Sequence, residues 1–194
     1  MTKVNSRKRQ ESLKEFLKND PFIIDVEIKE TGIEGFGAET FHQSLTLFGQ
    51  RVIILTHHAI LGLIRGFYER FGEDASNLLY LQGLGVGKEA IKRYKELFGT
   101  KELILKAHEI LLSVIGYTKK AKFTKVNEED YNLTLDGLIE CEILKGLKSG
   151  KTCHWYRGIV TGFFSDLMGK EYKAEEIKCI NKGDKECVLL LHPL

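Results

Sequence analysis

The middle of the chain repeats apolar residues at helical spacing. Apolar positions recur every three or four residues over 56–72, and the same period continues over 78–99 and again over 101–115. A shorter stretch with this spacing, residues 6–18, lies near the start of the chain. We therefore predict three successive amphipathic helices over residues 56–115 and a short helix before them.

The C-terminal third changes to the pattern of strands, and we predict one helix within it, from Cys153 to a C′ glycine at Gly169. The predicted strands, which are rich in β-branched, aromatic or apolar residues, are 22–30, 121–126, 131–135, 138–144 and a final hairpin over 172–191. Helices followed by strands predict an α+β fold, with an antiparallel sheet and helices packed on one face of it.

Two glycines in the second long predicted helix indicate close packing against another helix. Gly83 and Gly87 are four residues apart and so lie on one face, where another helix can pack closely. The run from Gly83 to Gly87 lacks the last glycine of a dinucleotide-binding fingerprint, because Lys88 is in that position. We therefore interpret these glycines as a helix-packing surface.

Length and charge limit the possible classes of protein. The 194 residues, 43% of them hydrophobic, are enough for one domain with a sizeable core. We expect a single domain over 1–194, with a core over 51–194 and an N-terminal extension over 1–50 that serves dimerisation. The formal net charge of +2 is spread along the chain, so direct nucleic-acid binding is not expected.

No stretch of the sequence has the roughly 20 apolar residues that a membrane span needs, and the N-terminus lacks an apolar signal segment. We therefore expect a cytoplasmic protein. Six Asn and four Gln, beside many Lys, Glu and Ile, fit a thermophilic source. In a reducing compartment, clustered cysteines more often bind metal than form disulfides.

Three of the four cysteines and one glutamate have the arrangement of a metal site. Cys179 and Cys187 flank a turn centred on Gly183, so that a hairpin would bring them together. Cys153 opens the predicted helix, and a β-bulge near Glu176 would turn that carboxylate toward Cys179. Three thiolates and a carboxylate suit tetrahedral Zn²⁺, and four protein ligands are typical of a structural site.

Other interpretations of these residues remain open. Cys179 and Cys187 could form a cross-strand disulfide, and His154 could replace Glu176 as the fourth ligand. Cys141 lies between two glutamates in the predicted strand 138–144, and we interpret it as a core thiol.

The spacing of these residues also resembles a family signature. The run Cys153-x4-Gly158-x3-Gly162, followed by Glu176-x2-Cys179-x3-Gly183-x3-Cys187, is similar to that of the vinyl-4-reductase domain family. Members of this family form the sensor modules of phenol-responsive transcription activators, where the matching cysteines and glutamate hold structural zinc. The resemblance implies a zinc element over 153–187 and a fold shared with haem-nitric-oxide sensor domains and transport-particle (TRAPP) subunits.

The resemblance further implies a cavity between helices and sheet that binds an apolar or aromatic small molecule. By residue type, the candidates for the polar end of this cavity are Tyr80, His108, Trp155 and Tyr156. Dimers are usual in the family, so we expect a homodimer. The sequence ends at Leu194, so we expect no output domain after it and a sensor that signals through a partner protein in trans. The alternatives are an accessory protein or reductase of tetrapyrrole metabolism and a lipid-binding assembly module.

Overall fold

The computed structural model describes residues 7–21, 26 and 46–194, and it divides into two units, residues 1–54 and 55–194. The described elements of the first unit are α1 (Arg7–Lys18), which confirms the predicted N-terminal helix, and the short pair β1 (Thr46–Leu47) and β2 (Gln50–Arg51). The predicted strand 22–30 falls outside the described residues except for Val26. The single-domain division stays a prediction.

The second unit contains the helices and the sheet that the sequence predicts. Its elements are α2 (His57–Phe71), η1 (Gly72–Asp74), α3 (Ala75–Leu97), α4 (Lys101–Val114), β3 (Lys120–Lys125), β4 (Tyr131–Asp136), α5 (Ile139–Leu144), α6 (His154–Met168), β5 (Tyr172–Lys178), η2 (Ile180–Lys182) and β6 (Cys187–Pro193). Thr56 and Thr100 begin α2 and α4 as N-caps, since each hydroxyl accepts a hydrogen bond from the backbone N–H three residues later. Gly169, with φ of 77°, ends α6 as expected.

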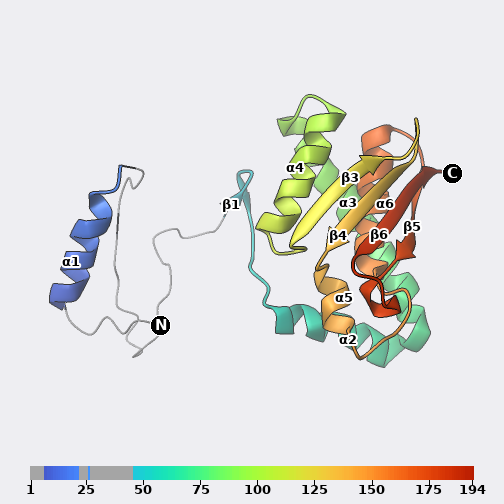
Figure 1. Ribbon diagram of the computed structural model, residues 1–194, viewed down its shortest axis with the longest axis horizontal. Helices are drawn as coiled ribbons and strands as arrows, with labels where there is room; N and C mark the ends of the chain where they lie inside the picture. The colour runs from blue at the N-terminus through green and yellow to red at the C-terminus, as the bar shows by residue number, and fades with distance from the viewer. Residues whose placement is uncertain (1–6, 22–25, 27–45) are drawn as a thin grey trace. The chain divides into compact units, whose positions relative to one another are not determined.

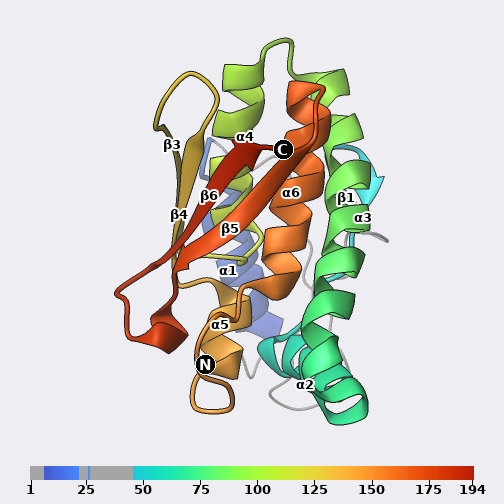
Figure 2. The same ribbon diagram turned by 90° about the vertical axis from the view of Figure 1, so that its right-hand side faces the viewer.

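The four strands form one antiparallel sheet in the order β3-β4-β6-β5. Figures 1 and 2 show α3 and α6 on one face of this sheet, with α4 beside β3. Inward-facing residues of β4 and β6, such as Leu133 and Leu189, are fully buried against Phe164 of α6. This arrangement confirms the predicted α+β fold.

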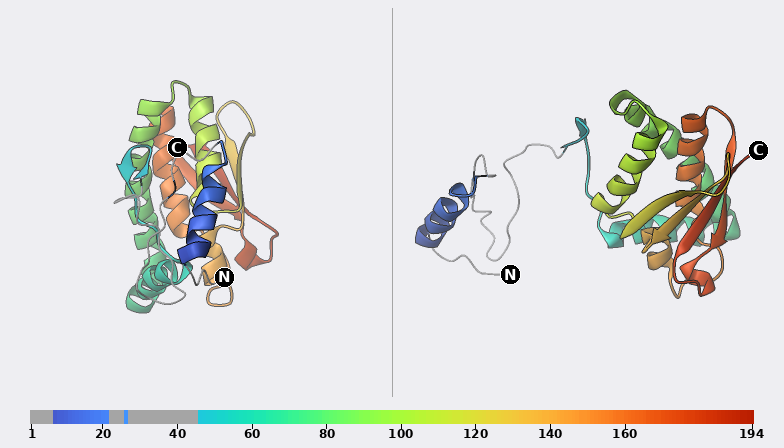
Figure 3. Two further views of the ribbon diagram at one scale, coloured as in Figure 1. Left: turned by 90° about the vertical axis from the view of Figure 1, so that its left-hand side faces the viewer. Right: turned by 45° about the horizontal axis from the view of Figure 1, so that its top comes forward.

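One predicted strand is wrong. Residues 139–144 form the short helix α5, which Figure 3 shows below the sheet, after a turn at Gly137 with φ of 68°. In the sequence, Glu140 and Glu142 alternate with apolar residues, which is the period of a half-buried strand. Glu140 is in fact buried, at 1% exposure, because its carboxylate hydrogen-bonds to the first turn of α6. A tertiary contact therefore overrides the local pattern.

Helices α3 and α6 cross at unusually short range. An added Cβ at Gly83 or Gly87 would overlap the backbone carbonyl of Trp155 or Ile159 in α6. Gly158 and Gly162 of α6 meet the backbone of α3 in the same way. The predicted helix-packing surface on Gly83 and Gly87 is thus confirmed, and α6 supplies a matching surface of its own.

A methyl group added at this crossing should destabilise the fold. For Gly87→Ala, the overlap with the Ile159 carbonyl forces the helices apart, and overpacking of this kind costs about 1–3 kcal/mol or more. The matched control is Gly85→Ala in the same helix, where nothing lies within 4 Å of an added Cβ. In that variant the free energy of unfolding should rise by about 0.5–1 kcal/mol, because alanine has a higher helix propensity than glycine. Denaturant unfolding measures both, and equal stabilities for the two variants would contradict the close crossing.

Candidate metal centre and buried polar core

Four buried cysteines converge from four elements at the end of the sheet next to α5. Cys141 lies in α5, Cys153 is the N-cap of α6, Cys179 precedes η2, and Cys187 begins β6. Each is fully buried, and all are free thiols. The Sγ atoms all lie within 4.8 Å of one another.

The sulfur spacing fits a single tetrahedral metal ion. With a metal–sulfur bond of about 2.3 Å, the ligand sulfurs of a tetrahedral site are ~3.8 Å apart. The Cys141 sulfur lies 3.1 Å from that of Cys153 and 3.8 Å from that of Cys179, which is 4.0 Å from that of Cys187. These distances exceed the roughly 2.05 Å of a disulfide bond. The four cysteines could therefore bind a metal ion.

Glu176, the predicted fourth ligand, borders this cluster. Its Oε1 accepts a hydrogen bond from the Thr152 N–H at 3.1 Å, and its Oε2 accepts one from the Cys153 N–H at 2.9 Å. The ladder between β5 and β6 is irregular between Glu176 and Lys178, close to where the sequence predicts a bulge. Burial raises the pKa of Glu176 to about 7, although the Cys153 N–H lowers it. Its role as a metal ligand stays a prediction.

Glu140 completes the hydrogen bonding of the same helix end. Its two oxygens accept hydrogen bonds from the Trp155 and Tyr156 N–H groups at 2.7 and 2.9 Å. The first N–H groups of a helix have no partner within the helix, so the two carboxylates replace a capping side chain. The thiol of Cys153, the N-cap residue, makes no capping hydrogen bond. It is therefore free to face the other sulfurs.

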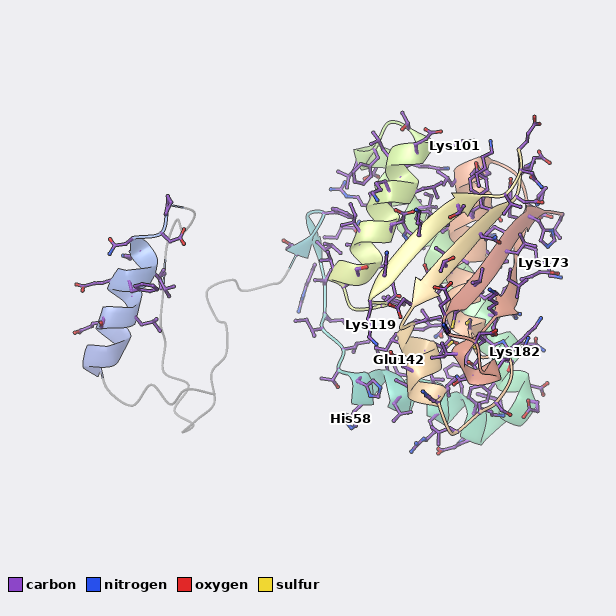
Figure 4. All side chains as sticks on the ribbon, in the orientation of Figure 1. His58, Lys101, Lys119, Glu142, Lys173 and Lys182 are labelled. Atoms are coloured by element: carbon purple, nitrogen blue, oxygen red, sulfur yellow. The ribbon has the colours of Figure 1, made fainter. Side chains whose placement is uncertain are left out.

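Asn181 joins the loops that carry the cysteines. Its side-chain N–H groups donate to the Cys141 backbone carbonyl at 2.9 Å and to the Thr152 hydroxyl at 2.8 Å. The backbone carbonyl of Asn181 accepts a hydrogen bond from the Gly150 N–H at 3.1 Å. Figure 4 shows the nearby side chains of Lys119 and Glu142, whose ion pair of 2.9 Å ties α5 to the start of β3. The sequence analysis missed Asn181 and Glu140, because only the fold brings them to the cysteines.

The position of Cys141 in the structure also differs from the one that the sequence predicts. The sequence analysis treats it as a core thiol, whereas the structure places it in the sulfur cluster. His154, the alternative ligand, lies outside this group of four, with its Nδ1 buried and without a hydrogen-bond partner among the described residues. The pKa of the Cys153 thiol is raised, first by the neighbouring sulfurs and then by burial. A bound cation reverses this effect, since coordinating thiols are deprotonated.

A second polar group lies inside the aromatic core between α3, α4 and α6. His108 of α4 is buried, with its Nδ1 3.2 Å from the Tyr94 hydroxyl and its Nε2 3.3 Å from the Tyr156 hydroxyl. Its ring stacks on Phe163 with centroids 4.2 Å apart. Burial lowers the pKa of His108 to about 3, so the imidazole is neutral. One hydroxyl then donates to the ring, and the other accepts from it.

The four residues that the sequence predicts for ligand binding therefore do not lie in one group. His108 and Tyr156 are in hydrogen-bond contact, whereas Tyr80 lies under the Arg157 guanidinium, 5.0 Å from the ring centroid. Trp155 packs beside Tyr117, with its Nε1 buried and without a hydrogen-bond partner within the described part of the chain. Tyr94 is the polar neighbour that the sequence analysis missed.

Comparison with solved structures places this architecture among three kinds of protein. The phenol-responsive sensory domain of the transcription activator PoxR aligns with a TM-score of 0.69 and 22% identity, over 77% of this chain and 80% of that one. A trafficking protein particle complex subunit 3 from Naegleria fowleri gives 0.54 and 12%, over 71% and 92%. An H-NOX protein from S. oneidensis gives 0.53 and 10%, over 75% and 79%. The chain shares their fold, as the sequence analysis expected.

Residues 138–193 match the V4R domain family model. The resemblance found in the cysteine and glycine spacing is thereby confirmed. An uncharacterised protein of Methanocaldococcus jannaschii is 29% identical over 120 residues, which are 59% of this chain and 62% of the relative. The chain thus aligns with less than two thirds of that relative. No described helix has the length and apolar character to cross a membrane.

The buried His108 predicts a specific dependence on pH. The pKa of His108 is about 3 in the folded protein and about 6.5 in the unfolded chain. The neutral imidazole therefore contributes to the free energy of unfolding above pH 6.5, and this contribution is lost as the pH falls toward 3. At pH 4.5 the free energy of unfolding has fallen by about 2–3 kcal/mol. The free energy of unfolding of wild type, relative to His108→Gln, should therefore decline over this interval. Denaturant unfolding at several pH values measures it, and parallel curves would contradict a neutral buried imidazole.

Proposed function

We propose that the protein is a zinc-containing sensor domain that binds an apolar or aromatic small molecule. The V4R domain and the fold shared with a phenol-responsive sensory domain support this function. The observation that carries it is the buried His108, which is hydrogen-bonded to Tyr94 and Tyr156 and stacks on the ring of Phe163. A binding site for such a ligand needs apolar walls with a few polar anchors.

The ligand would lie between the helices and the sheet, where the His108 and Tyr156 polar atoms can meet a hydroxyl. Phe163 stacks on His108 here, so an entering ligand must displace an aromatic side chain. Two surface hollows lie elsewhere. One of about 650 Å³ lies between α5, Gly137 and the turn at residues 183–185, and one of about 360 Å³ lies between the loop at residues 145–149 and η2. The site is therefore proposed as one that opens when the ligand binds.

Zinc would stabilise the frame of this site. Cys153, Cys179 and Cys187 would be three of its ligands, with the fourth position assigned to Glu176 by the sequence prediction. Cys153 begins α6, while Cys179 and Cys187 flank the turn after β5. A metal bound by all three fixes the start of α6 to the sheet, and four protein ligands leave no position for catalysis.

The output would pass through a protein–protein surface. Leu103, Ile110 and Val114 form an exposed apolar stripe on α4, at 55%, 55% and 71% exposure. Their spacing of seven and four residues puts them on one face of the helix. This stripe supports a homodimer or an interaction with the partner protein that receives the signal.

The lipid-binding alternative is less well supported. The Naegleria subunit with this fold is covalently bound to palmitic acid. An acyl thioester needs an accessible thiol, whereas all four cysteines of this chain are fully buried in one cluster. A small molecule held without a covalent bond fits these residues better.

The zinc proposal predicts one zinc ion per chain in native mass spectrometry, which also reports the oligomeric state. Because a structural metal contributes folding free energy, chelation should lower the melting temperature of wild type clearly. Cys187→Ser should have a lower melting temperature from the start and should respond little to chelator. A protein purified without metal and insensitive to chelator would remove zinc from the proposal.

The ligand proposal predicts that a phenolic compound raises the melting temperature more than an apolar compound of the same shape, such as toluene. Tyr156→Phe should reduce this preference about two- to twelvefold in affinity, because a hydrogen bond contributes about 0.5–1.5 kcal/mol. Tyr80→Phe is the matched control, since Tyr80 lies beside Arg157 and away from His108. If no aromatic compound shifts the melting temperature of wild type, the sensor function fails.

A further inference from the structure

We propose that Cys141, and not Glu176, supplies the fourth ligand of the metal, and that Glu176 instead caps helix α6. This inference rests on the proposed zinc site and names its ligands. It departs from the ligand set that the family signature implies, because Cys141 lies outside that signature.

The position of the Cys141 sulfur carries the inference. It lies 3.8 Å from the sulfur of Cys179, which is the ~3.8 Å separation that a tetrahedral site requires, and 3.1 Å from that of Cys153, which is shorter. Among the described residues, the group of possible ligand atoms that lie mutually within 4.8 Å consists of the four sulfurs. No oxygen of Glu176 belongs to that group.

Glu176 has another role in the structure, although its carboxyl group also lies beside the Cys179 thiol. Each of its oxygens accepts a backbone N–H at the start of α6, from Thr152 and from Cys153. At a helix N-terminus these N–H groups carry partial positive charge, which favours a carboxylate. If the carboxylate turned away from the helix end toward the metal, these two N–H groups, which belong to the buried Thr152 and Cys153, would lose their acceptors.

The surroundings of Cys141 also hold its sulfur in place. The neighbouring Glu140 is bound to the first turn of α6, and the Cys141 carbonyl accepts from the Asn181 side chain. Cys141 is thus held on both sides by residues that contact the other cysteine-bearing loops. Ordered neighbours that orient a ligand are characteristic of metal sites. Ligation by Cys141 would join α5, and the α2 helix packed on it, to the metal.

X-ray absorption at the zinc edge of the purified wild-type protein tests this inference directly. Four thiolates predict a shell of four sulfurs at about 2.3 Å, without the oxygen at about 2.0–2.2 Å that a carboxylate ligand would add. Three sulfurs and one oxygen would overturn the assignment of Cys141 and leave the zinc proposal intact. Absence of zinc would instead remove both, so the two failures are distinguishable.

Two variants provide a second measurement on cobalt-substituted protein, whose sulfur-to-metal charge-transfer absorption grows with the number of thiolates. Cys141→Ser should lower this absorption by about a quarter, since three of four thiolates remain. Glu176→Gln should leave it unchanged, because its side-chain carbonyl still accepts a backbone N–H. An absorption that Cys141→Ser leaves at the wild-type intensity would overturn the inference. If Cys141→Ser does not fold, the wild-type absorption measurement decides alone.

Discussion

The close crossing of α3 and α6 is the constraint on which the other features depend. Because both helices present glycines at their contact, their backbones approach to a distance that any Cβ would prevent. Tyr94 belongs to α3 and Tyr156 to α6, so this crossing sets the gap between the two hydroxyls that His108 bridges. A wider crossing would leave the imidazole with one partner, and an unpaired buried polar group costs about 1–3 kcal/mol.

The start of α6 is a second concentration of buried polar groups. Two carboxylates accept four backbone N–H groups there, and four thiols lie beside them. Burial raises the pKa of Glu140 to about 8, against the N–H groups of Tyr156 and Trp155, which lower it. Deprotonated thiols and carboxylates would repel one another in this position, and a divalent cation would offset that repulsion. The helix end and a metal ion bound by the cysteines would therefore act as one electrostatic unit.

The sequence predicts those parts of the molecule that follow local rules. Helical spacing identifies α2, α3 and α4, and the spacing of Gly83 and Gly87 identifies the crossing surface. The failures have tertiary causes. The alternation around Glu140 has the period of a strand. Its carboxylate is nevertheless buried, because it accepts hydrogen bonds from Trp155 and Tyr156 of α6, which are 15 and 16 residues further along the chain. The same wrong assignment of a strand explains why the sequence does not identify Cys141 as a member of the sulfur cluster, since a strand would point its side chain away from the candidate metal centre.

The buried polar core could be predicted only by residue type, because its members come from three helices. His108 is 14 residues from Tyr94 and 48 from Tyr156, separations that no periodicity connects. The sequence therefore proposes Trp155 for the ligand site and does not identify Tyr94, whose hydroxyl meets His108. Trp155 is adjacent to Tyr156, but neighbouring residues on a helix point in directions about 100° apart. Its ring meets Tyr117 instead of His108.

The first turn of α6 joins the two polar centres. Cys153 is its N-cap in the sulfur cluster, and Tyr156, three residues later, reaches His108 with its hydroxyl and Glu140 with its N–H. Three residues are almost one helical turn, so both residues move together whenever this turn shifts. Under the proposed function, a ligand that displaces Tyr156 would act against the hydrogen bonds that Glu140 and Glu176 make with this turn. A metal ion bound by Cys153 would add to this resistance, and the backbone contact between α6 and α3 at the glycines would carry part of any movement of the turn to α3.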